Sequence, residues 1–174
     1  MIDELILVRH GKAEDRGRTI NDNHRTLTDQ GIKEFQQILP GLVSLIGTGQ
    51  EVRLWSSPLK RAVQTAAMIS DSLGIGTVHE FKFIGDGNWK AFSRQVAGQR
   101  LPGCLIVIGH QPYLSEWSAS LTGLYLPFKK GSAAGFRLKT HSPLQGDLLW
   151  FLQPKAFRRL DSKSAEILPP LLQS

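Results

Sequence analysis

The sequence predicts an α/β fold in three layers, with a mostly parallel central sheet covered by helices on both faces. Short apolar runs alternate with helical segments along most of the chain, and this alternation is typical of βαβ units. The clearest runs are residues 5–8 and 104–108, in which every side chain is apolar. Such continuous runs indicate central strands that are buried on both faces. At 174 residues, the chain has the length of one domain.

Strands and helices are expected in alternating order. The other four strands are expected at residues 52–55, 77–81, 133–138 and 147–152. Helices are expected at residues 28–46, 58–73, 89–98 and 113–121, and the first of these shows apolar spacings of three and four most clearly. Two segments are expected to be loops: residues 12–25, which are polar and unusually long for a compact domain, and residues 82–88.

Capping residues mark the ends of the first two helices. Thr28 is a favourable N-cap, because its side chain can accept a hydrogen bond from the first turn. Pro40 interrupts the apolar face and is expected to kink or divide the first helix. Ser57 followed by Pro58 predicts the start of the second helix, since proline is favoured at the first helical position. That helix is expected to end near Gly74.

Composition and cysteine content place the chain among ordinary globular proteins. We expect a domain over residues 1–153 and a polar tail over residues 154–174 that packs as an extra helix or hangs loose. Cys104 lies in an apolar run without a second cysteine, so no disulfide framework is expected within the chain and a reducing compartment is favoured. No apolar run approaches the length of a membrane span. The expectation is a cytoplasmic protein that does not bind membranes.

The formal net charge of +6 admits nucleic acid as a partner. The Lys and Arg residues are scattered, however, and the densest pairs are Lys129-Lys130 and Arg158-Arg159. Without a basic stripe that contains aromatic residues, no nucleic-acid partner is expected. Positive charge equally attracts anionic substrates. Lys129-Lys130 themselves suit either a solvated turn or a site that attracts an acidic partner.

Three predicted strands lead to residues that are costly to bury unpaired. Arg9-His10-Gly11 follows the first strand, Arg61 lies in the first turn of the helix after Ser57-Pro58, and Gly109-His110 follows the strand 104–108. In open α/β sheets, ligands bind in the crevice beyond the carboxyl ends of the strands. We therefore expect two imidazoles and two guanidinium groups to face each other in one crevice.

This combination of side chains suits a phosphoryl group better than a metal ion. Each guanidinium offers forked donors to phosphate oxygens, and a helix N-terminus adds oriented N–H groups. Two fixed positive charges would repel a metal, and no H-x-x-x-H or C-x-x-C spacing is present. A deprotonated imidazole can attack phosphorus and carry the group as phosphohistidine. No metal and no cofactor are expected.

Three blocks of the sequence resemble the signatures of the histidine phosphatase superfamily, and they occur in the same order. They are Leu7-Val8-Arg9-His10-Gly11, the ten residues 56–65 around Ser57-Pro58 and Arg61, and Gly109-His110-Gln111-Pro112. The short chain, residues 25–28 and residues 131–134 are similar to the SixA-type phosphohistidine phosphatases within that superfamily. The resemblance covers residues 4–152 and implies a phosphoglycerate mutase-like fold.

The resemblance also implies roles for individual residues. His10 would be the nucleophile, and Arg9, Arg61 and His110 would complete the phosphate pocket together with Gly11. Arg25 would be a further ligand of the substrate or its phosphate; the alternative is that Arg25 only caps the loop before the following helix.

The chain departs from the larger phosphoglycerate mutase-like members at two positions. Arg16 stands where they carry Asn, and their acidic residue has no clear counterpart. Asp86 is a better candidate for that acid than Glu80, although its place between two glycines also suits a turn. A leaving imidazole needs less help from an acid than a leaving alkoxide. A weak acid is therefore compatible with phosphohistidine as the substrate.

The expected function is hydrolysis of phosphohistidine on a protein, such as a histidine-containing phosphotransfer domain, through phospho-His10. Two alternatives stay open. One is a small-molecule phosphomonoesterase that acts, for example, on sugar phosphates. The other is a module that binds phosphate or phosphoproteins without turnover, against which the intact set of His10, Arg9, Arg61 and His110 argues.

Overall fold

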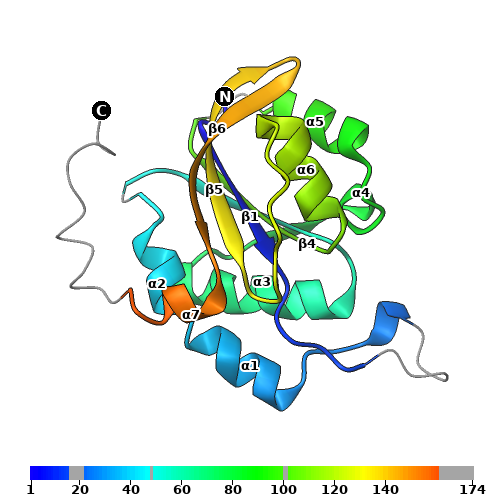
Figure 1. Ribbon diagram of the computed structural model, residues 1–174, viewed down its shortest axis with the longest axis vertical. Helices are drawn as coiled ribbons and strands as arrows, with labels where there is room; N and C mark the ends of the chain where they lie inside the picture. The colour runs from blue at the N-terminus through cyan, green and yellow to red at the C-terminus, as the bar shows by residue number, and fades with distance from the viewer. Residues whose placement is uncertain (16–21, 48, 100–101, 161–174) are drawn as a thin grey trace.

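The computed structural model describes residues 1–15, 22–47, 49–99 and 102–160, which form a six-stranded mixed sheet with helices on both faces (Figure 1). The strand order is β3-β2-β4-β1-β5-β6. Their bounds are β1 (Glu4–Arg9), β2 (Val52–Ser56), β3 (Val78–Glu80), β4 (Cys104–Gly109), β5 (Ala133–His141) and β6 (Leu144–Leu152). The first four strands pair in parallel, whereas β5 pairs antiparallel with both β1 and β6. The predicted α/β class is confirmed.

Helices cover both faces of this sheet. The bounds on one face are α1 (Asp29–Gln36), α2 (Leu39–Ser44), α3 (Lys60–Leu73) and α7 (Pro154–Phe157); on the other they are α4 (Lys82–Gly85), α5 (Trp89–Ala97) and α6 (Tyr113–Thr122). Successive side chains of a strand point to opposite faces. In β1, Leu5 and Leu7 accordingly join the core under α4–α6, and Ile6 and Val8 join the core under α1–α3. This double burial explains the apolar run. None of the helices in the described part combines the length and hydropathy that crossing a bilayer requires.

The capping predictions hold at the first helix and at the end of the second, where Gly74 is the C-cap, and fail at the start of the second. The Thr28 side chain accepts a hydrogen bond from the backbone N–H of Gly31. The expected long helix is divided into α1 and α2, and α2 carries Pro40 in its first turn. The second helix, in contrast, begins at Lys60 instead of Pro58. The cause is the sheet: Ser57 still donates its N–H to Ile108 of β4, so the chain stays extended.

Two further boundaries differ from the predictions. The expected loop 82–88 contains the short helix α4, because Ile84 turns inward and is buried against the sheet. The hairpin of β5 and β6 is also longer than expected. Its polar outer part remains paired in the antiparallel ladder, where Lys139 and Asp147 form an ion pair of 2.7 Å.

The tail that was predicted from residue 154 starts with α7. Phe157 of this helix is fully buried in the same core as α1–α3, and a Cβ on Gly41 would meet the Phe157 backbone oxygen. Residues 154–160 thus pack on α2. The division of the chain at residue 153 stays a prediction, and residues 161–174 lie outside the described residues.

Candidate active site

The two predicted imidazoles follow neighbouring strands. Arg9 at the end of β1 is in register with Gly109 at the end of β4, so His10 and His110 leave the sheet side by side. Their ring centroids are 5.0 Å apart. On the other side of β4, β2 ends at Ser56 and leads into α3, which carries Arg61 in its first turn. The structure therefore brings together the three strand ends that the sequence singles out.

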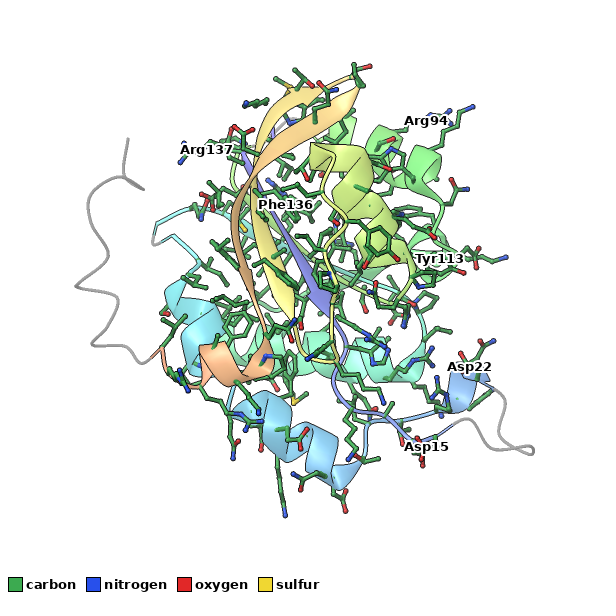
Figure 2. The ribbon with its side chains drawn as sticks, in the orientation of Figure 1. Asp15, Asp22, Arg94, Tyr113, Phe136 and Arg137 are labelled. Carbon is green, nitrogen blue, oxygen red and sulfur yellow. The ribbon has the colours of Figure 1, made fainter. Side chains whose placement is uncertain are left out.

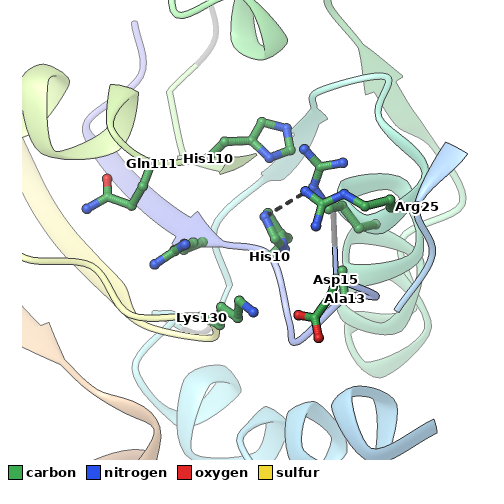
Figure 3. A pocket seen from close by; sticks show the side chains of 9 residues that line it. His10, Ala13, Asp15, Arg25, His110, Gln111 and Lys130 are labelled. Atoms are coloured by element: carbon green, nitrogen blue, oxygen red, sulfur yellow. Dashed lines mark hydrogen bonds between the residues drawn. The ribbon is translucent and has the colours of Figure 1, made fainter. Parts of the chain in front are cut away.

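These side chains line a cavity of about 260 Å³ (Figure 3). Its lining residues are Arg9, His10, Ala13, Asp15, Arg25, Arg61, His110, Gln111 and Lys130. Four of them are permanently cationic and one is a carboxylate. Such a cavity attracts anions, because charges of one sign concentrate their field in a cleft.

The hydrogen bonds of His10 define the tautomer of its ring. Its Nδ1 lies 2.7 Å from the backbone oxygen of Gly11, which can only accept, so Nδ1 carries the proton. Its Nε2 lies 3.3 Å from Nε of Arg61, which can only donate (dashed line in Figure 3). The lone pair of Nε2 therefore faces the cavity side of the ring, where a nucleophile is required.

Both imidazoles are held in the neutral form. Burial, followed by the nearby His110, Arg61 and Arg9, lowers the pKa of His10 from 6.5 to about 3, although the hydrogen bond to Gly11 acts in the opposite direction. Burial also lowers the pKa of His110 to about 3, with contributions from Arg61 and other cations. A neutral ring at neutral pH keeps Nε2 of His10 nucleophilic.

Some buried polar atoms in the cavity have no partner in the described part of the chain. They are both ring nitrogens of His110 and Nε of Arg9. The Arg9 side chain is nevertheless held in place, because its Nη1 donates to the backbone oxygen of Phe128 at 2.8 Å. Leaving buried polar atoms unpaired is costly, so these groups point to a ligand with several acceptor oxygens.

Asp22 joins the two guanidinium groups on the other side of the cavity. Its carboxylate lies 2.9 Å from Nη2 of Arg61 and 2.8 Å from Nη2 of Arg25. Its backbone oxygen also accepts from Nη1 of Arg61 at 2.7 Å. Asp15 follows β1 in the chain, and Asp22 begins the short 3-10 helix η1 (Asp22–His24) (Figure 2). A carboxylate between two guanidiniums orients both of them and offsets part of the positive field.

Arg25 reaches the cavity because the long loop folds back on itself. Ala13 and Leu27 form an antiparallel bridge, and Nη1 of Arg25 donates to the backbone oxygen of Glu14 at 2.6 Å. The approach of this loop to α1 requires glycine at position 31, where a Cβ would lie 2.0 Å from the backbone oxygen of Lys12. Arg25 thus lines the cavity, as the resemblance implies, and also braces the loop.

Gly11 anchors the start of the same loop to α3. Its N–H donates to Oγ1 of Thr65 at 3.1 Å, and the Thr65 hydroxyl donates to the backbone oxygen of Arg61 at 2.7 Å. Gly11 is therefore next to the cavity but is not among its lining residues. Its backbone links His10 to the helix that carries Arg61.

The structure does not bring Asp86 together with the other predicted residues. Gly85, just before it, lies against Ser57, so Asp86 stands at the correct edge of the sheet. Its side chain is exposed, however, and does not line the cavity, because the backbone turns outward at the end of α4. Glu80 is likewise exposed. Arg16 lies outside the described residues.

Four polar residues that line or bridge the cavity were not predicted as site residues: Asp15, Asp22, Gln111 and Lys130. Gln111 belongs to the recognised Gly109–Pro112 block, and its amide bonds to Ser115 at the start of α6. Lys130 comes from the turn before β5. Asp15 and Asp22 lie in an aperiodic loop, where no pattern announces them. Among the described residues, no group of three or more metal-binding side chains is present.

The sequence comparison identifies one family and one curated relative. The model of the histidine phosphatase superfamily (branch 1) matches residues 5–102. An uncharacterized protein of Picosynechococcus sp. is 34% identical over 143 residues, which cover 77% of this chain and 84% of the relative.

Solved structures share the fold. The protein histidine phosphatase SixA complexed with tungstate has a TM-score of 0.73 at 23% identity, over 88% of this chain and 98% of that chain. A phosphoserine phosphatase mutant from Entamoeba histolytica, in complex with phosphoserine, has a TM-score of 0.64 at 16% identity, over 92% and 100% of the two chains. The implied phosphoglycerate mutase-like fold is confirmed.

Proposed function

Because the chain belongs to the histidine phosphatase superfamily (branch 1), we propose that it is a phosphohistidine phosphatase that uses His10 as the nucleophile on a protein substrate. The observation that carries this proposal is the state of His10. Its ring is neutral, its Nε2 has a lone pair, and three arginines and a lysine surround the space before it. A neutral nucleophile among fixed cations suits attack on a phosphoryl group.

In the first step, Nε2 of His10 attacks phosphorus, and the bond between phosphorus and the substrate nitrogen breaks. The departing imidazole takes the electron pair of that bond and a proton from the solvent. Arg9, Arg61 and Arg25 spread the charge of the equatorial oxygens, and Nε of Arg61 turns from the His10 lone pair to one of them. The two ring nitrogens of His110 have no other partner in the described part of the chain, and His110 uses them to form hydrogen bonds with the substrate.

In the second step, water attacks the phosphoryl group on Nε2 of His10. The bond between phosphorus and Nε2 breaks, the electron pair returns to His10, and inorganic phosphate leaves. Nδ1 of His10 keeps its hydrogen bond to Gly11 in both steps, which fixes the ring orientation.

The placement of the carboxylates supports phosphohistidine as the substrate. Asp22 accepts hydrogen bonds from two guanidinium groups and is therefore a poor proton donor. Asp86 is exposed and does not line the cavity. Since imidazole leaves more readily than an alkoxide, cleavage of an N–P bond tolerates this arrangement better than cleavage of an ester.

A phosphate ester is the second candidate substrate. Asp15 lines the cavity and is a carboxylate that an ester leaving group would require as its acid. One structural neighbour is a phosphoserine phosphatase. Both observations favour a small-molecule phosphomonoesterase.

Turnover on matched substrates distinguishes the two candidates. The kcat/KM for a chemically phosphorylated histidine-containing phosphotransfer domain is compared with values for phosphoserine, a sugar phosphate and p-nitrophenyl phosphate. We expect a preference of at least about 100-fold for the phosphohistidine protein. We also expect Asp15→Asn to spare phosphohistidine turnover. A higher kcat/KM for an ester, lost in Asp15→Asn, would overturn the proposal in favour of the esterase.

A further inference from the structure

A second hollow adjoins the cavity and shares two of its residues. It has a volume of about 600 Å³ and is bounded by the turn before β5, by α1 and by α7. Its lining residues are Arg9, Glu34, Lys129, Lys130, Gln153, Pro154, Lys155 and Arg158. Arg9 and Lys130 also line the cavity that holds His10. We call this hollow the basic groove.

The basic groove carries a strong excess of positive charge. Lys129, Lys130, Lys155 and Arg158 are exposed, and none of the four forms an ion pair within the part of the chain that the structure describes. Glu34 is the one carboxylate among the lining residues, and it accepts a hydrogen bond from Gln30. Cations that repel one another without counterions are stabilised by an anionic ligand.

The fold holds these cations in place from two distant parts of the chain. The N–H of Lys129 donates to Oγ of Ser132 at 3.0 Å, and the N–H of Ser132 donates to the backbone oxygen of Lys129 at 2.8 Å. Gly131 has a φ of +78°, which favours glycine, and its N–H donates to the backbone oxygen of Arg9 at 3.1 Å. On the other wall, the buried Phe157 fixes α7 and thereby Lys155 and Arg158.

We propose that the basic groove binds carboxylate side chains that flank the phosphorylated residue of a protein substrate. This inference rests on the proposed function and specifies the surface chemistry of its substrate. The two hollows share Arg9 and Lys130, so a protein segment that places its phosphoryl group in the cavity with His10 can continue along the basic groove. A small phosphate ester would occupy the cavity alone, whereas an acidic protein surface would extend along the other cations of the basic groove, Lys129, Lys155 and Arg158.

Exposed charge of this kind affects recognition more than stability. Solvated lysines contribute little to folding, but complementary charge across an interface steers association and discriminates among partners. The turn at Lys129–Lys130 and helix α7 therefore act together as a docking surface for acidic proteins.

A pair of phosphohistidine peptides tests the groove. One peptide carries glutamates on both sides of the phosphohistidine, and the other carries glutamines at the same positions. For the full-length wild-type chain, we expect kcat/KM to be about tenfold higher for the glutamate peptide at low salt, and this preference to shrink as the salt concentration rises.

The variants compare the groove with a distant basic surface. Lys155→Glu combined with Arg158→Glu reverses charge in the groove without touching the residues that line the cavity. We expect this double variant to lower the ratio of the two kcat/KM values to about one or below. Lys90→Glu combined with Arg94→Glu reverses charge at exposed positions of α5, which lies on the opposite face of the sheet from α7 (Figure 1), and should leave the ratio unchanged. A partly unfolded fraction would lower both kcat/KM values by the same factor, so it does not change their ratio.

The outcomes separate the groove from the proposed function. Equal kcat/KM values for both peptides in the wild type would overturn the groove while supporting the phosphatase. If neither peptide is hydrolysed, the proposed function fails, and the Kd values of the same peptides with a hydrolysis-resistant phosphonate analogue decide on the groove. A difference in Kd that disappears in the α7 double variant supports the groove, and equal Kd values overturn it.

Discussion

Nε of Arg61 lies 3.3 Å from Nε2 of His10, so the guanidinium that would bind the phosphoryl group also holds the nucleophilic lone pair. Replacement of Arg61 by lysine keeps the charge but removes the Nε–H and the planar fork. We expect Arg61→Lys to lower kcat/KM on a phosphohistidine substrate by about 100-fold or more. Lys60→Ala, at the exposed neighbouring position, should change it less than about twofold. A mild effect of Arg61→Lys would show that charge alone suffices.

Asp22 competes with a bound phosphoryl group for the same two guanidiniums. Asp22→Asn keeps an acceptor oxygen toward Arg61 and removes the negative charge. We expect the Kd for inorganic phosphate, measured by titration calorimetry, to fall about three- to tenfold in this variant. Asp71→Asn serves as the control, because Asp71 is exposed and lies at the opposite end of α3 from Arg61. Weaker phosphate binding in Asp22→Asn would instead mean that Asp22 mainly positions Arg61.

Asp86 is exposed outside the cavity, so its carboxylate has no route to the leaving group in this arrangement. We expect Asp86→Asn to retain phosphohistidine turnover within about threefold. Steady-state kinetics of the purified variant, with circular dichroism as a check on folding, give the answer. Loss of turnover in a folded Asp86→Asn protein would show that Asp86 acts as the acid, as the sequence suggests. It would also remove the support that a weak acid gives to phosphohistidine as the substrate.

The two buried imidazoles make stability depend on pH. In the folded state the pKa of His110 is lowered from 6.5 to about 3, so between these values the unfolded chain binds the proton and the folded chain does not. Stability is therefore lost as the pH falls below 6.5, by about 1.4 kcal/mol per pH unit for one such histidine. Urea unfolding of His110→Gln should show a slope smaller by about that amount. An unchanged slope in His110→Gln would contradict the burial of this histidine in its neutral form.

The convergence of His10, Arg61 and His110 could be predicted from the sequence because the relevant signals are local. A run such as 104–108 is apolar at every position since both faces of β4 are buried. Polar residues directly after such strands stand at the carboxyl edge of the sheet whatever the loops do. The two layers of helices follow from the same alternation of strands and helices along the chain.

The acidic residues of the site could not be predicted in this way. Asp22 forms an ion pair with Arg61, and it lies in a segment that returns to the end of β1 through the bridge between Ala13 and Leu27. The path of that loop depends on contacts between distant segments, which leave no periodic signal. The start of α3 shows the same limit: Ser57 and Pro58 fit a helix start, but the hydrogen bond from the Ser57 N–H to Ile108 of β4 keeps the chain extended beyond the end of β2.

The most direct test of the account is to trap the phosphoryl group on His10. The full-length protein is mixed with phosphoramidate that carries labelled phosphorus, quenched in alkali within the first turnover, and digested for mass spectrometry. We predict an acid-labile, alkali-stable phosphoryl group on the peptide that contains His10, its absence in His10→Asn, and its presence in His24→Asn, which alters a histidine outside the cavity lining. A labelled His110 peptide, or turnover that persists in His10→Asn, would contradict the proposed nucleophile.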